Sequence, residues 1–124
     1  MNTSVQIEVL QEYARVRLAG EHSFRGAVER VKDAIRSCRD QRIRKLLVDS
    51  LDVRGFDPPT TIERLWMAEE IAEAVGGGAV KIAIVTRPEM VDKHKFGVMV
   101  SQLRGLEVDV FLSKEEALAW LLAP

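Results

Sequence analysis

The stretch LLVDSLDVRGFDPPTTIERLW, residues 46–66, predicts a passage from a buried strand through a polar loop into a helix. Its start belongs to the short apolar run KLLVD, which is typical of a strand covered on both faces of a sheet. Thr60 and Glu63 have the spacing of a capping box, which satisfies the backbone N–H groups that open a helix. The glycines at 76–78 predict the end of that helix, because glycine accepts the left-handed conformation found there.

Strands and helices alternate along the rest of the chain. Residues 5–9 and 13–20 alternate between apolar and polar side chains, which predicts a hairpin with one dry and one wet face. An apolar stripe at helical spacing follows over residues 23–40, with Ser23 as its cap. The runs VKIAIV and LEVDVF predict two further strands, each followed by a helix, the first capped by Asp92 and the second by Ser113.

The order of elements is therefore β-β-α-β-α-β-α-β-α. Repeated strand-helix units require parallel strands joined by crossovers, so we expect one α/β domain, residues 1–124, with a mainly parallel five-stranded sheet. We expect the first strand to lie antiparallel at an edge and the helices to pack on the sheet. The helix side chains expected to face inward after residue 60 are Ile62, Leu65, Ala68, Ala72, Val75, Phe96, Met99, Val100 and Leu103.

Composition narrows the class of protein. The net charge of −1 gives no field to attract nucleic acid, and we expect no nucleic-acid partner. No apolar stretch approaches the roughly 18 residues of a membrane span, and the start MNTSVQIEV has no signal-peptide pattern, so a cytoplasmic protein is expected. The single cysteine, Cys38, excludes an internal disulfide and falls on the apolar side of a predicted helix, which predicts a buried thiol.

Residue types that perform catalysis are sparse. The histidines, His22 and His94, accompany no serine in a nucleophile-elbow pattern, and no Cys, His, Asp and Glu set has the spacing of metal ligands. Asp49, Asp52 and Asp57 surround one strand end and form an alternative, as oxygen ligands for Mg²⁺ or a phosphoryl acceptor. We favour the interpretation that they bind backbone N–H groups in turns. We therefore predict no catalytic residue, no metal and no cofactor.

The loop over residues 50–61 is the stronger candidate for recognition. A hydroxyl at a helix N-terminus lies at the positive end of the helix dipole, where a phosphate would change a docking surface. Apolar side chains beside guanidinium groups suit a protein interface or an anionic ligand, and Val53 is expected to be exposed among them. The candidate residues for phosphorylation or partner binding are Ser50, Arg54, Phe56, Asp57, Thr60, Thr61 and Arg87.

Four stretches of the chain resemble the STAS-like domains, in the branch similar to bacterial anti-sigma-factor antagonists. They are KLLVDSLDV, TTIERLWMAEEIAE, KIAIVTRPEMVDKHKFGVMVSQLRGLEVDVF and SKEEALAWL. The resemblance implies a non-enzymatic switch that binds a regulatory protein, such as an anti-sigma factor or a kinase-like partner. It also implies a phosphoacceptor serine in an Asp-Ser-Ser-Gly motif, but here Asp57 precedes two prolines, so Thr60 and Thr61 would substitute only with a shift of one or two positions.

Two functions stay open on this basis. The first is a regulatory module that docks a protein partner through the 50–61 loop and the following helix. The alternative is a small-molecule or lipid-binding domain, because a related branch of STAS-like domains holds such ligands in an apolar pocket at the sheet. That pocket would lie between the helices at 61–75 and 93–104 and the sheet. A homodimer through the helix faces that bear Trp66 or Trp120 is a further expectation.

Overall fold

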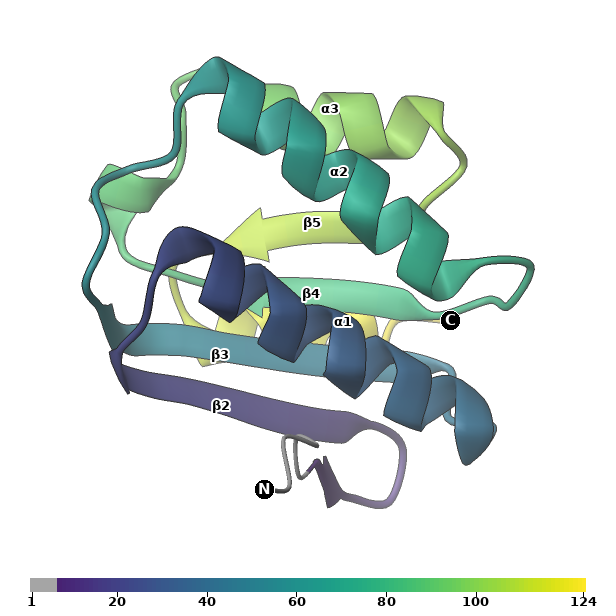
Figure 1. Cartoon of the computed structure of the whole chain (residues 1–124). Helices are drawn as coiled ribbons and strands as arrows, with labels where there is room; N and C mark the ends of the chain where they lie inside the picture. Colours follow the sequence, from purple (N-terminus) through teal and green to yellow (C-terminus); the bar gives the residue numbers. More distant parts are fainter. Residues whose placement is uncertain (1–6) are drawn as a thin grey trace, which may run out of the picture.

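The strands lie side by side in the order in which they occur along the chain. In the computed structural model, which describes residues 7–124, the sheet has five strands in the order β1-β2-β3-β4-β5 (Figure 1). Strand β1 is antiparallel to β2 at one edge, and the other neighbouring pairs are parallel. This confirms the predicted topology, although Val5 lies outside the described residues. The strands are β1 (Glu8–Val9), β2 (Ala14–Glu21), β3 (Lys45–Arg54), β4 (Lys81–Val85) and β5 (Val108–Phe111).

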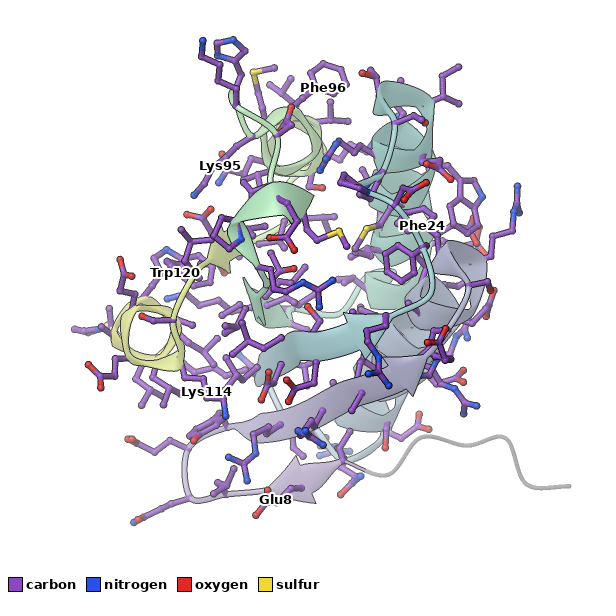
Figure 2. All side chains as sticks on the ribbon, turned by 90° about the vertical axis from the view of Figure 1, so that its left-hand side faces the viewer. Glu8, Phe24, Lys95, Phe96, Lys114 and Trp120 are labelled. Carbon is purple, nitrogen blue, oxygen red and sulfur yellow. The ribbon has the colours of Figure 1, made fainter. Side chains whose placement is uncertain are left out.

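Helices cover both faces of the sheet. Figure 1 shows α1, α2 and α3 on one face, and the turned view in Figure 2 shows α4, which carries Lys114 and Trp120, on the other. Within the described residues, no helix combines the length and the apolarity that crossing a membrane requires. The helices are α1 (Phe24–Asp40), α2 (Thr61–Val75), α3 (Phe96–Leu103) and α4 (Lys114–Leu121), with a short 3₁₀ turn, η1 (Pro88–Met90), before α3.

The predicted start of α2 is confirmed in its hydrogen bonds, whereas α3 begins at Phe96, later than the predicted residue 93. The hydroxyl of Thr60 accepts from the backbone N–H of Glu63 (3.1 Å), and the Glu63 carboxylate accepts from the backbone N–H of Thr60 (2.9 Å). The Asp92 carboxylate accepts from the backbone N–H of Phe96 (2.8 Å), although the cap position itself is Lys95, with a φ of 50°. These local contacts lock the direction in which each helix leaves its loop.

Helix α2 rests on α1 and α3 and not on the sheet. Its backbone makes close contacts with these two helices and with no strand of the described chain. Ion pairs reinforce both supports, since Glu70 of α2 binds Lys32 of α1 and Glu69 of α2 binds Arg104, the residue that caps the end of α3. Helix α2 therefore forms a roof that stands above the sheet, a position that Figure 1 also shows.

The inward faces predicted for α2 and α3 were partly wrong. Ile62 and Leu65 are 78% and 39% exposed, and Met99 and Leu103 are exposed as well. The reason is that α2 turns its inner face toward the gap between α1 and α3. Because α2 has apolar residues on several sides, its packing against these two helices decides which side faces inward. The buried residues of α2 are Ala68, Ile71, Ala74 and Val75.

Strand β3 is longer than the sequence predicted, which shortens the recognition loop. After a register shift in the pairing of β2 with β3, residues 52–54 also pair with β2. Val53 was expected to be an exposed loop residue, but it belongs to the strand and is only 3% exposed. Ser50 and Arg54 likewise belong to the strand, and the loop proper covers only residues 55–60. Gly55 begins this loop at a φ of 111°, where a Cβ atom would lie 2.3 Å from the carbonyl oxygen of His22. Glycine is required there because both the conformation and the space exclude a side chain.

Candidate functional site

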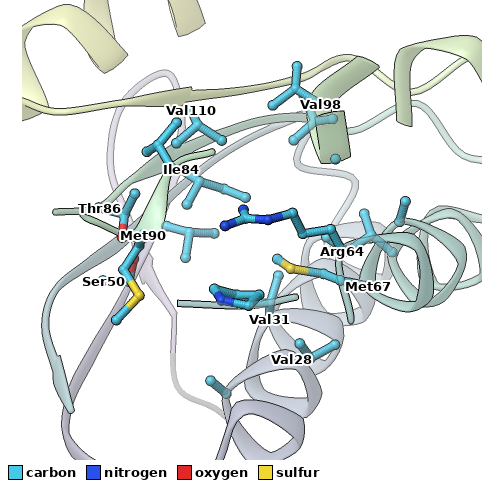
Figure 3. Close-up of a pocket in the computed structure, with 18 of the residues that line it drawn as sticks. Val28, Val31, Ser50, Arg64, Met67, Ile84, Thr86, Met90, Val98 and Val110 are labelled. Atoms are coloured by element: carbon cyan, nitrogen blue, oxygen red, sulfur yellow. The ribbon is translucent and has the colours of Figure 1, made fainter. Parts of the chain in front are cut away.

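An apolar cavity of about 150 Å³ lies beneath α2, between the three helices and the sheet (Figure 3). Its deep wall consists of buried side chains such as Val31 of α1, Val48 of β3 and Ile71 of α2. Apolar cavities of similar volume bind molecules of the size of benzene. The raised position of α2 explains the cavity, because side chains alone must fill the gap between this helix and the strands.

The open side of the cavity lies at the carboxyl ends of the strands. The residues there are half-buried or exposed, and they come from three connections: the loop before α2, the start of α2, and the segment from η1 to α3. They include Pro59, Arg64, Met90, Val91 and Lys95. Ligands of open parallel sheets commonly bind at this edge. The mouth is therefore where an entering molecule would meet polar groups first.

Most polar groups at the cavity already have partners. The Ser50 hydroxyl donates to the carbonyl of Val85 (2.7 Å), and the Ser101 hydroxyl donates to the carbonyl of Gly97 (2.8 Å). Lys95 forms an ion pair with Asp109 (2.8 Å). Hydroxyls engaged in this way hold the backbone in place and are poor nucleophiles. This part of the site is built for shape and apolar contact.

The structure brings two of the predicted site residues, Ser50 and Phe56, to the cavity. The Phe56 ring meets the ring of Phe24 edge to face, with 5.6 Å between the centroids. Phe24 in turn contacts Trp66, at 6.0 Å. This aromatic group closes one side of the cavity near α1, which Figure 2 shows at the labelled Phe24. Stacking of this kind stiffens the wall where the loop leaves β3.

Arg87 lies outside the cavity and holds the end of β3. Its guanidinium donates to the carbonyls of Leu51 (2.9 Å) and Val53 (2.6 Å) and forms an ion pair with Glu89 (2.9 Å). The pKa of the exposed Glu89 carboxyl is lowered, first by its own backbone N–H and then by Arg87. Arg87 therefore has a structural role at the end of β3, and its charge is already balanced by Glu89.

The remaining predicted site residues lie on the surface beside the mouth. Asp57, Thr60 and Thr61 are exposed, and the Thr60 hydroxyl is engaged as the cap of α2. Arg54 is exposed and faces Glu21 at 3.9 Å. These side chains form a rim around residues 54–61, without a cavity of their own.

The three aspartates at the end of β3 do not converge. Asp49 is buried on the α4 side, where it pairs with Lys114 (3.1 Å), whereas Asp52 pairs with Arg17 (2.6 Å). Asp57 is exposed in the loop. Over residues 7–124, no group of three or more Asp, Glu, His or Cys side chains is placed to hold a metal ion. The alternative of a Mg²⁺ or phosphoryl site on these aspartates finds no support in this arrangement.

The two tryptophans have partners within the chain. Trp66 lies under the guanidinium of Arg25 (4.7 Å), and Trp120 packs on Phe111 (5.5 Å) and under Lys81 (4.5 Å). These contacts account for both rings without a second copy of the chain. A homodimer through them stays a prediction.

Sequence reasoning identified only one residue, Ala68, of the α2 face that lines the cavity. Arg64, Met67, Ala68 and Ile71 all line it, and they follow the spacing i, i+3, i+4 and i+7 of one helix face. This helical spacing could be read from the sequence. However, the stripe begins with the charged residue Arg64, so the neighbouring stripe, which begins with the apolar Ile62, was predicted to face inward.

A comparison with solved structures supports the fold. No family model and no curated protein matches the chain. Among solved structures, an uncharacterized protein of the DUF3478 family with a SpoIIAA-like fold, from Shewanella loihica, is 18% identical with a TM-score of 0.55, over 95% of this chain and 92% of that one. The anti-sigma factor antagonist SpoIIAA in its unphosphorylated form is 21% identical with a TM-score of 0.44, over 94% and 95%. The chain has a SpoIIAA-like fold.

Proposed function

We propose that this chain is a non-enzymatic binding domain whose cavity holds a small apolar molecule. The observation that carries the proposal is the apolar cavity of about 150 Å³ beneath α2, in the place expected for a ligand of this fold. Burial of apolar ligand surface contributes roughly 25 cal/mol per Å², so even a small molecule gains useful affinity there. The engaged hydroxyls of Ser50 and Ser101 support binding in preference to bond-breaking.

The direct test combines native mass spectrometry with a variant that fills the cavity. Ala68 is 2% exposed and lines the cavity, so Ala68→Leu would occupy the space that a ligand needs. Ala72→Leu is the matched control, because this alanine lies on the same helix and does not line the cavity. We expect toluene and octanol to bind the natural chain and Ala72→Leu, and not Ala68→Leu. Equal binding to all three, or to none, would refute the proposal.

A second candidate function is docking of a regulatory protein, and two exposed apolar residues favour it. Ile62 and Leu65 are 78% and 39% exposed at the start of α2, next to the exposed Thr60 and Thr61. Apolar side chains displayed together in this way commonly mark protein contacts. The resemblance to anti-sigma-factor antagonists supports an anti-sigma factor or a kinase-like protein as the partner, in a cytoplasmic setting.

Cross-linking in cell extract, followed by mass spectrometry, tests this docking. We expect cross-links near residues 55–65 to one regulatory protein, lost in Ile62→Asp. Leu112→Asp is the matched control, because Leu112 is also exposed (53%) but follows β5, away from α2. Cross-links that survive Ile62→Asp, or that fail equally in both variants, would argue against the interface. The same spectra report phosphate on Thr60 or Thr61, the accessible hydroxyls of this rim.

A further inference from the structure

Arg64 occupies the inward face of α2, where an apolar residue is expected. Its side chain points from α2 into the cavity, as Figure 3 shows, and it lines the cavity together with Met67 and Ile71 of the same stripe. The residue is half-buried, and its stem packs against Gly97 of α3. The guanidinium thus lies over an otherwise apolar chamber near its mouth.

The guanidinium of Arg64 has no partner in the part of the chain that the structure describes. Two other charged groups near the mouth are engaged elsewhere: Lys95 pairs with Asp109, and the Asp92 carboxylate accepts from the backbone N–H of Phe96 and keeps its negative charge. The arginines that form ion pairs with a carboxylate include Arg15, Arg17, Arg36, Arg54, Arg87 and Arg104. Among the described residues, the charge of Arg64 is therefore left without a partner at a place where the protein has room for another molecule.

This placement of Arg64 is unfavourable for the protein alone. A cation over apolar surface loses hydration, and without an anion nothing compensates for that loss. Arg64 also lies in the first turn of α2, where the positive end of the helix dipole disfavours a cation. An anion beside the guanidinium would offset both costs, because it would pair with the guanidinium and would also interact favourably with the positive end of the helix dipole. An apolar ligand alone would leave them unchanged.

We propose that the ligand is an amphiphile with an anionic oxygen head group, a carboxylate or a phosphate, which Arg64 binds while the apolar part fills the cavity. This inference rests on the proposed binding function and specifies its ligand class. The planar guanidinium presents paired N–H donors that match two oxygens of such a head group. The enclosed volume of about 150 Å³ suits a short alkyl chain or one ring as the apolar part.

The test is calorimetric titration at neutral pH with three probes of equal chain length: octanoate, octyl phosphate and octanol. We expect at least one of the two anions to bind the natural chain roughly ten- to a hundredfold more tightly than octanol, because a charge-assisted pair adds to the same apolar contact. Arg64→Gln should remove this preference and leave octanol binding intact, which also reports that the variant is folded. Arg64→Lys should restore part of it.

The control is Arg44→Gln, which removes an exposed arginine just before β3, outside the cavity lining, and should keep the preference. A preference for octanoate or for octyl phosphate would identify the head group. If all three probes bind equally, or if Arg64→Gln keeps the preference, the role of Arg64 is refuted and the binding function stands. If no probe binds, octanol included, the binding function itself fails.

Discussion

The two faces of the sheet are packed differently. Under α4, Leu47 and Val85 of the strands meet Ala117 and Leu121 of the helix, and all four are at most 1% exposed. On the opposite face, Val48 and Ile84 of the same two strands line the cavity. Alternate residues of β3 and β4 thus face a filled core on one side and an open chamber on the other.

The difference follows from how each helix is supported. Helix α4 makes close backbone contacts with β3, β4 and β5, so its small residues let it lie directly on the sheet. Among the described elements, helix α2 makes close backbone contacts with α1 and α3 alone, and these two helices hold its backbone away from the strands. A cavity in a protein costs packing energy, and the filled α4 face shows that this sequence can pack tightly elsewhere. The cavity is therefore a local consequence of the raised position of α2.

The largest expected effect comes from shortening one leucine on each face. Leu47→Ala, in the filled face, should lower the free energy of unfolding by about 3–5 kcal/mol, because the side chain loses contacts on all sides. Leu18→Ala, at the cavity wall, should cost only about 2–3 kcal/mol, because that side chain already borders empty space. Urea denaturation of both variants measures the gap. Equal losses would mean that the chamber is filled in solution.

Loss of the ion pair that joins α2 to α1 should have the next largest effect on the free energy of unfolding. Lys32 is 6% exposed and binds Glu70 (2.6 Å) and Glu29 (3.2 Å). Glu70→Gln should cost about 1.5–3 kcal/mol, because it weakens a charged hydrogen bond to a buried ammonium. The exposed Glu73, on the same helix, is the control, and Glu73→Gln should stay within about 0.5 kcal/mol.

The same pair predicts a dependence on pH. The hydrogen bond to Glu70 raises the pKa of Lys32 above its usual 10.5, against the opposing effect of burial. The stabilisation is complete below the pKa of the unfolded state and is lost as the pH rises through the raised folded-state pKa. The difference between the natural chain and Glu70→Gln should therefore shrink above about pH 10.5 in denaturation curves. A difference that instead grows with pH would contradict this assignment.

Overfilling each face gives a smaller contrast. Ala117→Leu should cost about 1–3 kcal/mol, because the fully buried Ala117 has no free space around it. Ala68→Leu should change stability by less than about 1 kcal/mol, because the added atoms enter the chamber. Thermal unfolding of the two variants measures the contrast. If Ala68→Leu is the more damaging change, α2 lies closer to the sheet than described.

The smallest effect tests whether the helices on the cavity side of the sheet are loosely packed along their whole length. Cys38, at the far end of α1, is fully buried, and burial raises the pKa of its thiol to about 11. Because only the thiolate reacts, modification by a disulfide reagent should be at least about a hundredfold slower in the folded than in the unfolded chain. Rapid labelling under native conditions would show that the whole layer opens, and not only the chamber.

Much of the fold could be predicted because its signals are local. The order of elements, the parallel sheet and the cap at Thr60 each depend on residues that are neighbours in the chain. The length of β3 was not predictable, because residues 52–54 become strand only through pairing with β2. Residues 55–60 of the candidate loop lie beside the cavity, but residues 50–54 belong to β3. Arg64, Met67 and Ile71 of the inner stripe of α2 were missed.

The sequence by itself determined the order of the strands and helices, the caps at Ser23, Thr60 and Ser113, and the α/β class of the fold. Only the tertiary structure decided which face of α2 turns inward, that a cavity remains beneath it, and that Arg64 faces this cavity without a partner among residues 7–124. The physical reason is that caps and turns act over a few residues, whereas the orientation of a helix with apolar residues on several sides depends on its neighbours. Here those neighbours are α1 and α3.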